Sequence, residues 1–290
     1  MAQPREKSVD SLGLPIHCLE WGDPKGEPLL LMHGFLDLAY SWKLFADELL
    51  ARANRPLRII APDCRGHGDS GWVGAGGYYH FPDYIFDLQR VLESNQIDRF
   101  KLIGHSMGGT ISFVFTGTFP DRVDRLVLIE GIGPVGMEFA AAPGRMGQWI
   151  GEVRQRGRSH FRQYSSIEAG ASQLCQTHPR LDPSFAHDLA RAAMKRHPNG
   201  KWIWKFDPLH RTTAPQPFYT DQALAFLRRI SCPVLIVEGN ESHQTRRADK
   251  ARRYAALADH AVEVIENASH MVHQDNPRQL ARVVGQFLRL

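Results

Sequence analysis

A serine in a glycine-rich turn is the first candidate for chemistry. The segment F-K-L-I-G-H-S-M-G-G-T, residues 100–110, contains the pattern G-x-S-x-G around Ser106, between an apolar run and a helix-like stretch. A serine on a sharp strand-to-helix turn is held in a strained backbone conformation with its hydroxyl exposed. The N-terminus of the following helix favours negative charge that develops nearby. We therefore predict that Ser106 is a nucleophile.

A histidine late in the chain is the candidate base. The segment E-N-A-S-H-M-V-H-Q-D-N-P, residues 266–277, follows the last predicted strand and precedes the last predicted helix. A serine hydroxyl needs an adjacent general base before it attacks a carbonyl. We predict that His270 is this base and that His273 supports or lines the site.

Two backbone N–H groups are needed to stabilise the oxyanion that forms when a serine attacks a carbonyl. Met107, directly after the nucleophile, is expected to supply one. Phe35, in the loop that ends L-L-L-M-H-G-F at residues 29–35, is expected to supply the other. Gly34 allows this loop to bend, and His33 is expected to brace it by hydrogen bonding rather than to act as a base. The residues expected to line the site are His33, Gly34, His105 and His273.

The hydrophobic pattern predicts the scaffold for these residues. Short β-rich apolar runs alternate with helical stretches, which indicates an α/β protein with a mostly parallel sheet. Strands are predicted at residues 16–20, 29–32, 58–61, 100–103, 125–129, 234–237 and 262–265, and helices at 42–51, 82–94, 107–119, 245–257 and 277–288.

One interval interrupts this alternation. Residues 133–229 contain no strong strand signal, and helix-like patches occur at 182–196 and 220–229. The interval is too long for a simple crossover. We predict a core of residues 1–132 and 230–290 with a mostly helical cap, residues 133–229, as a lid over the site. A purely structural insertion is the alternative.

Composition limits the class of protein. The chain has 290 residues and a formal net charge of +4. Basic residues gather at 154–158 and 246–253, which we interpret as solvated faces, so neither a nucleic-acid nor a membrane partner is expected. The four cysteines are scattered and lack metal-ligand spacing, which indicates free thiols in a reducing compartment. No apolar leader or membrane-length segment is evident, so a cytoplasmic location is predicted. The oligomeric state is left open.

Several motifs together resemble those of the α/β-hydrolase family, in its lid-bearing serine-hydrolase branch. H-G-F at residues 33–35 is similar to the oxyanion motif, and A-P-D-C-R-G-H-G-D-S at 61–70 to the turn after the fourth strand. G-H-S-M-G-G resembles the nucleophile elbow, and S-H-M-V-H-Q-D-N-P the histidine loop, although Ser269 stands where glycine is usual. The L-I-E-G-I-G-P segment most resembles serine-hydrolase-like proteins. The resemblance implies an eight-stranded sheet flanked by helices, a helical cap after the sixth strand, a Ser-acid-His triad, and no cofactor or metal.

The acid of this triad departs from the family pattern. Its usual place is three residues after Gly239, where this chain has Ser242. The sixth strand instead ends in a carboxylate, Glu130, before a glycine-rich exit. Burial of that charge is costly unless it is paired, and an imidazolium would pair with it. We expect Glu130 to be the acid, with Glu241 as the alternative.

A serine nucleophile favours acyl transfer over the chemistry of the family's aspartate enzymes. We predict a hydrolase that cleaves a small carboxylic ester or thioester through an acyl-enzyme, with a small-molecule substrate as its partner. Two alternatives are a carbon–carbon bond hydrolase of the same fold and a non-catalytic small-ligand receptor.

Overall fold

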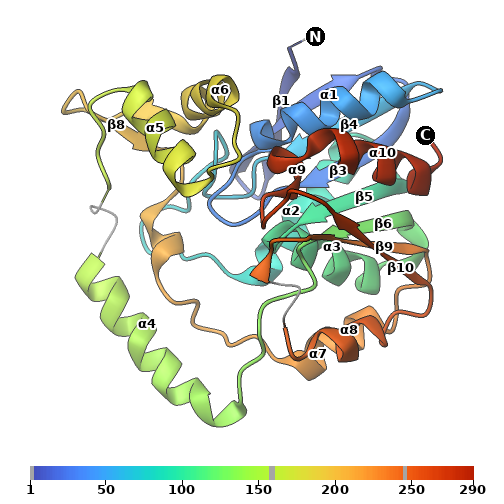
Figure 1. The fold of residues 1–290 in the computed structure, drawn as a ribbon. Coiled ribbons are helices and arrows are strands. Elements are labelled where there is room, and N and C mark those ends of the chain that lie inside the picture. Colours follow the sequence, from blue (N-terminus) through green and yellow to red (C-terminus); the bar gives the residue numbers. More distant parts are fainter. Residues whose placement is uncertain (1–2, 157–160, 244–246) are drawn as a thin grey trace.

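A single eight-stranded sheet forms the centre of the molecule (Figure 1). The computed structural model describes residues 3–156, 161–243 and 247–290. The strand order is β1-β2-β4-β3-β5-β6-β9-β10; β1 pairs antiparallel with β2, β2 pairs antiparallel with β4, and the other neighbours are parallel. The strands are β1 Arg5–Ser11, β2 Leu14–Gly22, β3 Glu27–Met32, β4 Leu57–Pro62, β5 Phe100–His105, β6 Val123–Ile129, β9 Val234–Gly239 and β10 His260–Ile265.

Helices cover both faces of this sheet (Figure 1). On one face, α2 (Phe81–Ser94) and α3 (Met107–Thr118) bury residues such as Leu88 and Phe115. On the other face, α1 (Lys43–Arg52) and α10 (Pro277–Leu288) do the same. Strands covered on both faces are mostly apolar, and every residue of β5 and β9 is buried, including Lys101 and Glu238. The prediction of an eight-stranded, mostly parallel α/β sheet is confirmed.

The sequence missed one strand and misjudged part of the insertion. β1 has only Val9 and Ser11 buried, so its apolar signal is too weak to detect from the sequence. Residues 133–229 do contain strands, because β7 (Met194–Arg196) and β8 (Trp202–Trp204) form a hairpin. The helix predicted at 182–196 ends where β7 begins. The helices of this interval are α4 Ala142–Arg156, α5 Ile167–Thr177, α6 Pro183–Ala193 and α7 Thr220–Leu227.

The helix α7 packs on the core rather than with the rest of the insertion. Its residues Ala223, Leu224 and Leu227 belong to the same buried cluster as the inner face of α3. The two helices lie so close that a side chain added at Gly117 of α3 would meet the backbone oxygen of Phe226 at 2.4 Å. The helix α7 is therefore part of the core, and the part of the insertion that packs separately from the core ends before it.

The predicted helix at 245–257 is shorter in the structure, and one of its charges is buried. Residues 244–246 lie outside the described residues, and α8 spans Lys250–Tyr254. Arg253 is fully buried; its guanidinium donates to the backbone oxygens of Ile132 and Pro134 at 2.6 and 2.7 Å and pairs with Asp249. The interpretation of 246–253 as a solvated face is thus wrong for Arg253, which anchors the chain where it leaves β6. Of the basic run at 154–158, residues 157 and 158 lie outside the described residues.

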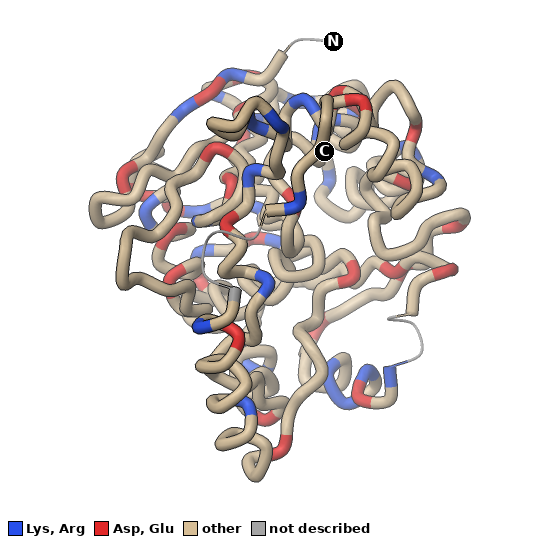
Figure 2. The backbone as a smooth tube through the Cα atoms, turned by 90° about the vertical axis from the view of Figure 1, so that its left-hand side faces the viewer, with Lys and Arg blue, Asp and Glu red and all other residues tan. Residues whose placement is uncertain are grey.

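Acidic and basic residues are mixed over the molecule in the view of Figure 2. None of the helices within the described residues has the length and apolar character needed to cross a bilayer.

A stack of buried imidazoles joins the insertion to the core. The His210 ring, from the insertion, lies 4.1 Å from the His67 ring and 3.9 Å from the Tyr79 ring, centroid to centroid. Burial lowers the pKa of His210 from 6.5 to about 3 and lowers the pKa of His67 as well. Both side chains are therefore neutral in the folded protein at pH 7.

We expect the free energy of unfolding to fall in mild acid because of this stack. The unfolded chain takes up a proton at His210 below pH 6.5, whereas the folded chain resists protonation until the pH approaches about 3. The contribution of His210 to the free energy of unfolding is therefore fully present above pH 6.5 and is lost as the pH falls below that value. At pH 5 the loss from His210 alone is about 2 kcal/mol. Urea unfolding at pH 7 and pH 5 measures this loss. His210→Gln should show a smaller loss between pH 7 and pH 5 than the unaltered chain. His260→Gln, at an exposed position, should show the same loss as the unaltered chain. Equal losses in the two variants would contradict the assignment of the pH dependence to His210.

Candidate active site

Ser106 stands at the turn between β5 and α3 with the backbone expected of an elbow. Its φ and ψ are 52° and −114°, a conformation that L-residues rarely adopt and that costs on the order of 1–3 kcal/mol. Close packing maintains this turn: a Cβ at Gly104 would lie 2.3 Å from the oxygen of Gly108, and a Cβ at Gly108 would lie 2.1 Å from the oxygen of Met32. The G-x-S-x-G pattern therefore reflects steric requirements on both sides of the serine.

His270 lies between Ser106 and Glu130. Its Nε2 is 3.0 Å from the Ser106 Oγ, and its Nδ1 is 3.4 Å from the Glu130 Oε2. The strands explain how residues so far apart meet. β5 and β6 are adjacent and parallel, with His105 opposite Ile129, so the next residue of each strand leaves the sheet at the same edge.

The Glu130 carboxylate is buried and well supplied with donors. Its side chain is 0% exposed, and its backbone φ is 51°. The Gly239 N–H donates to Oε1 at 2.8 Å, and the Ser242 hydroxyl donates to Oε2 at 2.5 Å. Hydrogen bonds of this kind offset the cost of burying a carboxylate.

Ser242, which stands at the usual position of the acid, therefore contacts the Glu130 carboxylate instead. The sequence indicated only that this position lacks an acid, and it did not indicate a role for the hydroxyl. The signal that could have revealed it is the pairing of β6 with β9, which brings the ends of the two strands together. A short donor at 242 complements a long acid at 130.

The alternative acid, Glu241, points elsewhere. It is exposed and forms an ion pair with Arg180, in the loop between α5 and α6. Glu238 is also occupied, by Lys250 at 2.6 Å and by the Tyr254 hydroxyl. Within the described part of the chain, Glu130 is the only carboxylate within 4.0 Å of a His270 ring nitrogen.

The two expected oxyanion donors come from segments at the serine turn. Met107 is the first residue of α3, where backbone N–H groups have no partner within the helix. The Phe35 N–H likewise has no hydrogen-bond partner among the described residues. Its loop crosses the elbow closely, since a Cβ at Gly34 would lie 2.8 Å from the His105 Nδ1.

The three other histidines expected to line the site are buried behind its loops. His33 donates through Nδ1 to the Gly34 oxygen at 2.7 Å and accepts from the Cys64 N–H at 2.8 Å, as a brace for the loop. His105 donates through Nε2 to the backbone oxygen of His270 at 2.8 Å. Burial lowers the pKa of His105 well below 6.5, so this ring is neutral. His273 is fully buried and lies 3.3 Å from the Ser41 Oγ.

A serine on a strand-to-helix turn, beside a histidine at the edge of such a sheet, defines the α/β-hydrolase class of proteins. The model of the α/β hydrolase fold family matches residues 27–277, and this chain belongs to that family.

The chain is also similar to individual hydrolases and to a solved structure. The chain is 27% identical over 279 residues to a serine hydrolase-like protein of Danio rerio, covering 93% of this chain and 83% of the relative. It is 25% identical over 265 residues to a 2-hydroxy-6-oxo-2,4-heptadienoate hydrolase of Pseudomonas putida, covering 91% and 89%. Among solved structures, the hypothetical protein PA1622 of Pseudomonas aeruginosa PAO1 matches with a TM-score of 0.88 and 27% identity, covering 98% of this chain and 99% of that one.

Proposed function

We propose that this α/β hydrolase cleaves small carboxylic esters or thioesters through an acyl-enzyme, with Ser106, His270 and Glu130 as its triad. The observation that carries the proposal is the position of His270, whose two nitrogens face the serine hydroxyl at 3.0 Å and the buried carboxylate at 3.4 Å. The similarity to a serine hydrolase-like protein supports the same class of activity.

In the first half of the reaction, His270 Nε2 takes the proton of Ser106 as Oγ attacks the substrate carbonyl. Glu130 stabilises the imidazolium that forms. It also fixes the tautomer of His270 in which the Nδ1 carries a proton and faces Glu130. The oxyanion of the tetrahedral intermediate accepts hydrogen bonds from the N–H groups of Phe35 and Met107. His270 then gives its proton to the leaving oxygen or sulfur as the bond from that atom to the carbonyl carbon breaks. The alcohol or thiol departs, and the acyl group stays on Ser106.

In the second half, a water molecule enters where the leaving group departed. His270 Nε2 takes its proton, the hydroxide oxygen attacks the acyl carbonyl, and the same two N–H groups stabilise the new oxyanion. Collapse of this intermediate breaks the bond to Ser106 Oγ, which regains a proton from His270. The carboxylic acid is released, and the serine is restored.

The insertion is the proposed cap over this site. Two contacts support this proposal: Arg180 pairs with Glu241, next to Ser242, and the His210 ring lies 6.2 Å from the ring of Phe35. A cap held so near the oxyanion loop limits the length of substrate that fits. This favours a small-molecule substrate over a polymer or a lipid droplet.

Carbon–carbon bond hydrolysis is a second candidate. The observation in its favour is the similarity to the Pseudomonas putida protein named as a heptadienoate hydrolase. Such a reaction would use the same serine and histidine, and a substrate panel must therefore contain a vinylogous β-diketone acid as well as esters.

We expect short and medium acyl esters to be cleaved faster than long-chain ones, because the cap restricts the acyl site. The measurement is a kcat/KM series over p-nitrophenyl esters of increasing chain length, alongside an acyl thioester and a long-chain triglyceride emulsion. Activity that rises only at an oil–water interface would contradict the prediction. Release of one equivalent of p-nitrophenol without turnover would instead indicate a ligand receptor, and turnover of the diketone acid alone would indicate the second candidate.

A further inference from the structure

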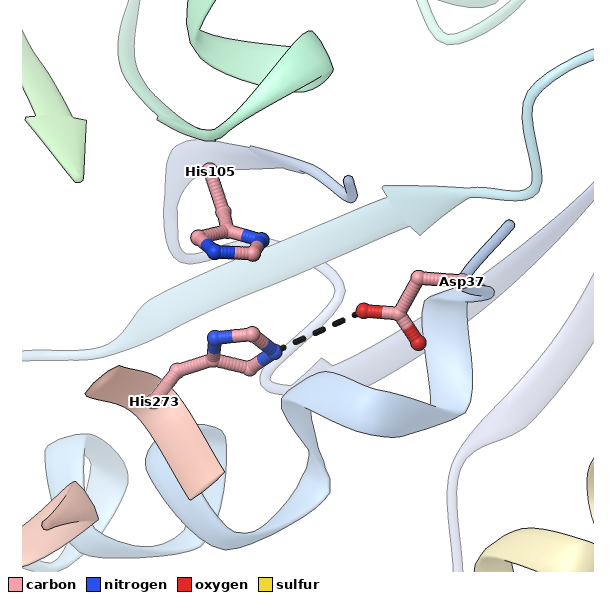
Figure 3. Close-up of side chains that lie close together, drawn as sticks. All are labelled: Asp37, His105 and His273. Atoms are coloured by element: carbon pink, nitrogen blue, oxygen red, sulfur yellow. Dashed lines mark ion pairs between the residues drawn. The ribbon is translucent and has the colours of Figure 1, made fainter. Parts of the chain in front are cut away.

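Behind the site lies a cluster of one carboxylate and two imidazoles. Asp37, His105 and His273 each offer one ligand atom, and these atoms all lie within 4.8 Å of one another. Figure 3 shows the two rings and the carboxylate facing a common point, with the Asp37 Oδ2 3.6 Å from the His273 Nε2. The Ser41 hydroxyl donates to the same carboxylate at 2.8 Å and so helps to orient it.

His105 carries a buried ring nitrogen that has no hydrogen-bond partner among the described residues. His105 is 1% exposed, and its Nε2 carries the proton because it bonds a carbonyl oxygen, which can only accept. The His105 Nδ1 is therefore a bare lone pair, and it has no hydrogen-bond partner among the described residues. His273, which is 0% exposed, faces the Asp37 carboxylate through its Nε2. A buried polar atom left unsatisfied destabilises the folded state, so a ligand that satisfies it is favoured.

We propose that Asp37, His105 and His273 bind a divalent transition-metal ion of the Zn²⁺ type. Two imidazole nitrogens and one carboxylate oxygen are a donor set that Zn²⁺ and Co²⁺ accept, with further positions open. Zinc–ligand bonds of about 2.1 Å require donor atoms roughly 3.4 Å apart in a tetrahedral arrangement. The Asp37–His273 pair, at 3.6 Å, is close to this separation. The His105 ligand atom lies within 4.8 Å of the other two and completes the set through a movement on the order of 1 Å.

A second group of similar composition shows why this cluster is distinctive. His17, Asp63 and Asp69 also bring ligand atoms within 4.8 Å. There the Asp63 carboxylate already accepts from the N–H groups of Ala39 and Asp69, at 2.6 and 2.9 Å, and bonds the His17 Nδ1 at 2.8 Å. Both oxygens of the Asp63 carboxylate already accept hydrogen bonds. A substitution of His17 is therefore a matched control for the substitutions at the proposed metal site.

Each ligand lies next to one part of the proposed catalytic machinery. Asp37 is two residues after Phe35, His105 directly precedes Ser106, and His273 is three residues after His270. His105 also holds the His270 backbone oxygen. Drawing the three ligands together around an ion would shift these loops relative to one another. Metal binding is therefore expected to inhibit hydrolysis, and this consequence, unlike the binding itself, rests on the proposed function.

The test is a titration of the full chain with Co²⁺, followed by visible absorption and by the thermal unfolding midpoint. We expect one equivalent to bind, Zn²⁺ to displace it, and both ions to raise the midpoint, because a ligand that binds only the folded state stabilises it. Asp37→Asn and His273→Gln should each weaken binding at least about tenfold. Circular dichroism of both variants without metal establishes that they fold.

Two controls locate the ion. His17→Gln should bind Co²⁺ as the unaltered chain does, and so should His270→Gln, since His270 is not a ligand of the proposed site. Binding lost in His270→Gln but kept in Asp37→Asn and His273→Gln would place the ion at the proposed catalytic base and overturn the proposal. Absence of stoichiometric Co²⁺ binding by the unaltered, folded chain would overturn it equally. Both readouts are independent of whether any ester is hydrolysed.

Discussion

Ser106→Ala is expected to lower kcat for ester hydrolysis by about 10⁶-fold, to the level of the background reaction. Removal of a triad serine has an effect of this size because the acyl-enzyme can no longer form. The residual rate that oxyanion stabilisation and substrate binding sustain without a nucleophile is small by comparison. The measurement is kcat on the best p-nitrophenyl ester, together with covalent labelling by a fluorophosphonate probe.

Labelling distinguishes loss of the nucleophile from loss of the fold. The probe should modify the unaltered chain at Ser106 alone and should leave Ser106→Ala unmodified. Ser112→Ala is the matched control, since Ser112 lies on α3, the helix that follows Ser106, and donates to the Gly108 oxygen at 2.7 Å within the protein interior. If the probe still labels Ser106→Ala, the nucleophile has been wrongly assigned.

The parts of the site that depend on local sterics were predictable from the sequence. The elbow needs glycine at 104 and 108 because backbone atoms of neighbouring segments occupy the space of a side chain. Such a requirement leaves a short, recognisable motif. The sheet was predictable for a related reason, because strands covered on both faces are mostly apolar along their whole length.

Features that depend on contacts between distant segments were not predictable. Ser242 donates to Glu130 across 112 positions of the chain, and neither residue belongs to a motif that names the other. Arg253 similarly anchors residues 132–134 from more than a hundred positions away, and in the sequence it is one of several basic residues in a row. Strand β1 was missed because its outward face is polar, so that little in its composition marks it as part of a sheet.

Glu130→Gln is expected to lower kcat by roughly 10⁴-fold, because removing the charge of a triad acid removes control of the histidine tautomer. The amide is nearly the same size, but its NH₂ group cannot accept from the donors that converge on the carboxylate, the Gly239 N–H and the Ser242 hydroxyl. Glu241→Gln is the matched control. It removes an exposed ion pair with Arg180 and should leave kcat near that of the unaltered chain. The reverse pattern would make Glu241 the acid.

An exchange of positions tests the same assignment in the opposite direction. Because the Ser242 hydroxyl touches the very oxygen that faces His270, an aspartate at 242 would carry its carboxylate into the space that Glu130 now fills. Asparagine is the appropriate partner at 130, since it is shorter and tolerates the positive φ found there. Glu130→Asn with Ser242→Asp should therefore recover at least about tenfold of the activity that Glu130→Asn alone loses. Ser242→Asp alone should be impaired, because two carboxylates in contact cannot both ionise readily. If the folded double variant shows no recovery, the carboxylate acts only from the end of β6. If activity recovers, a negative charge beside His270 is what the reaction needs, and the strand that supplies it matters less.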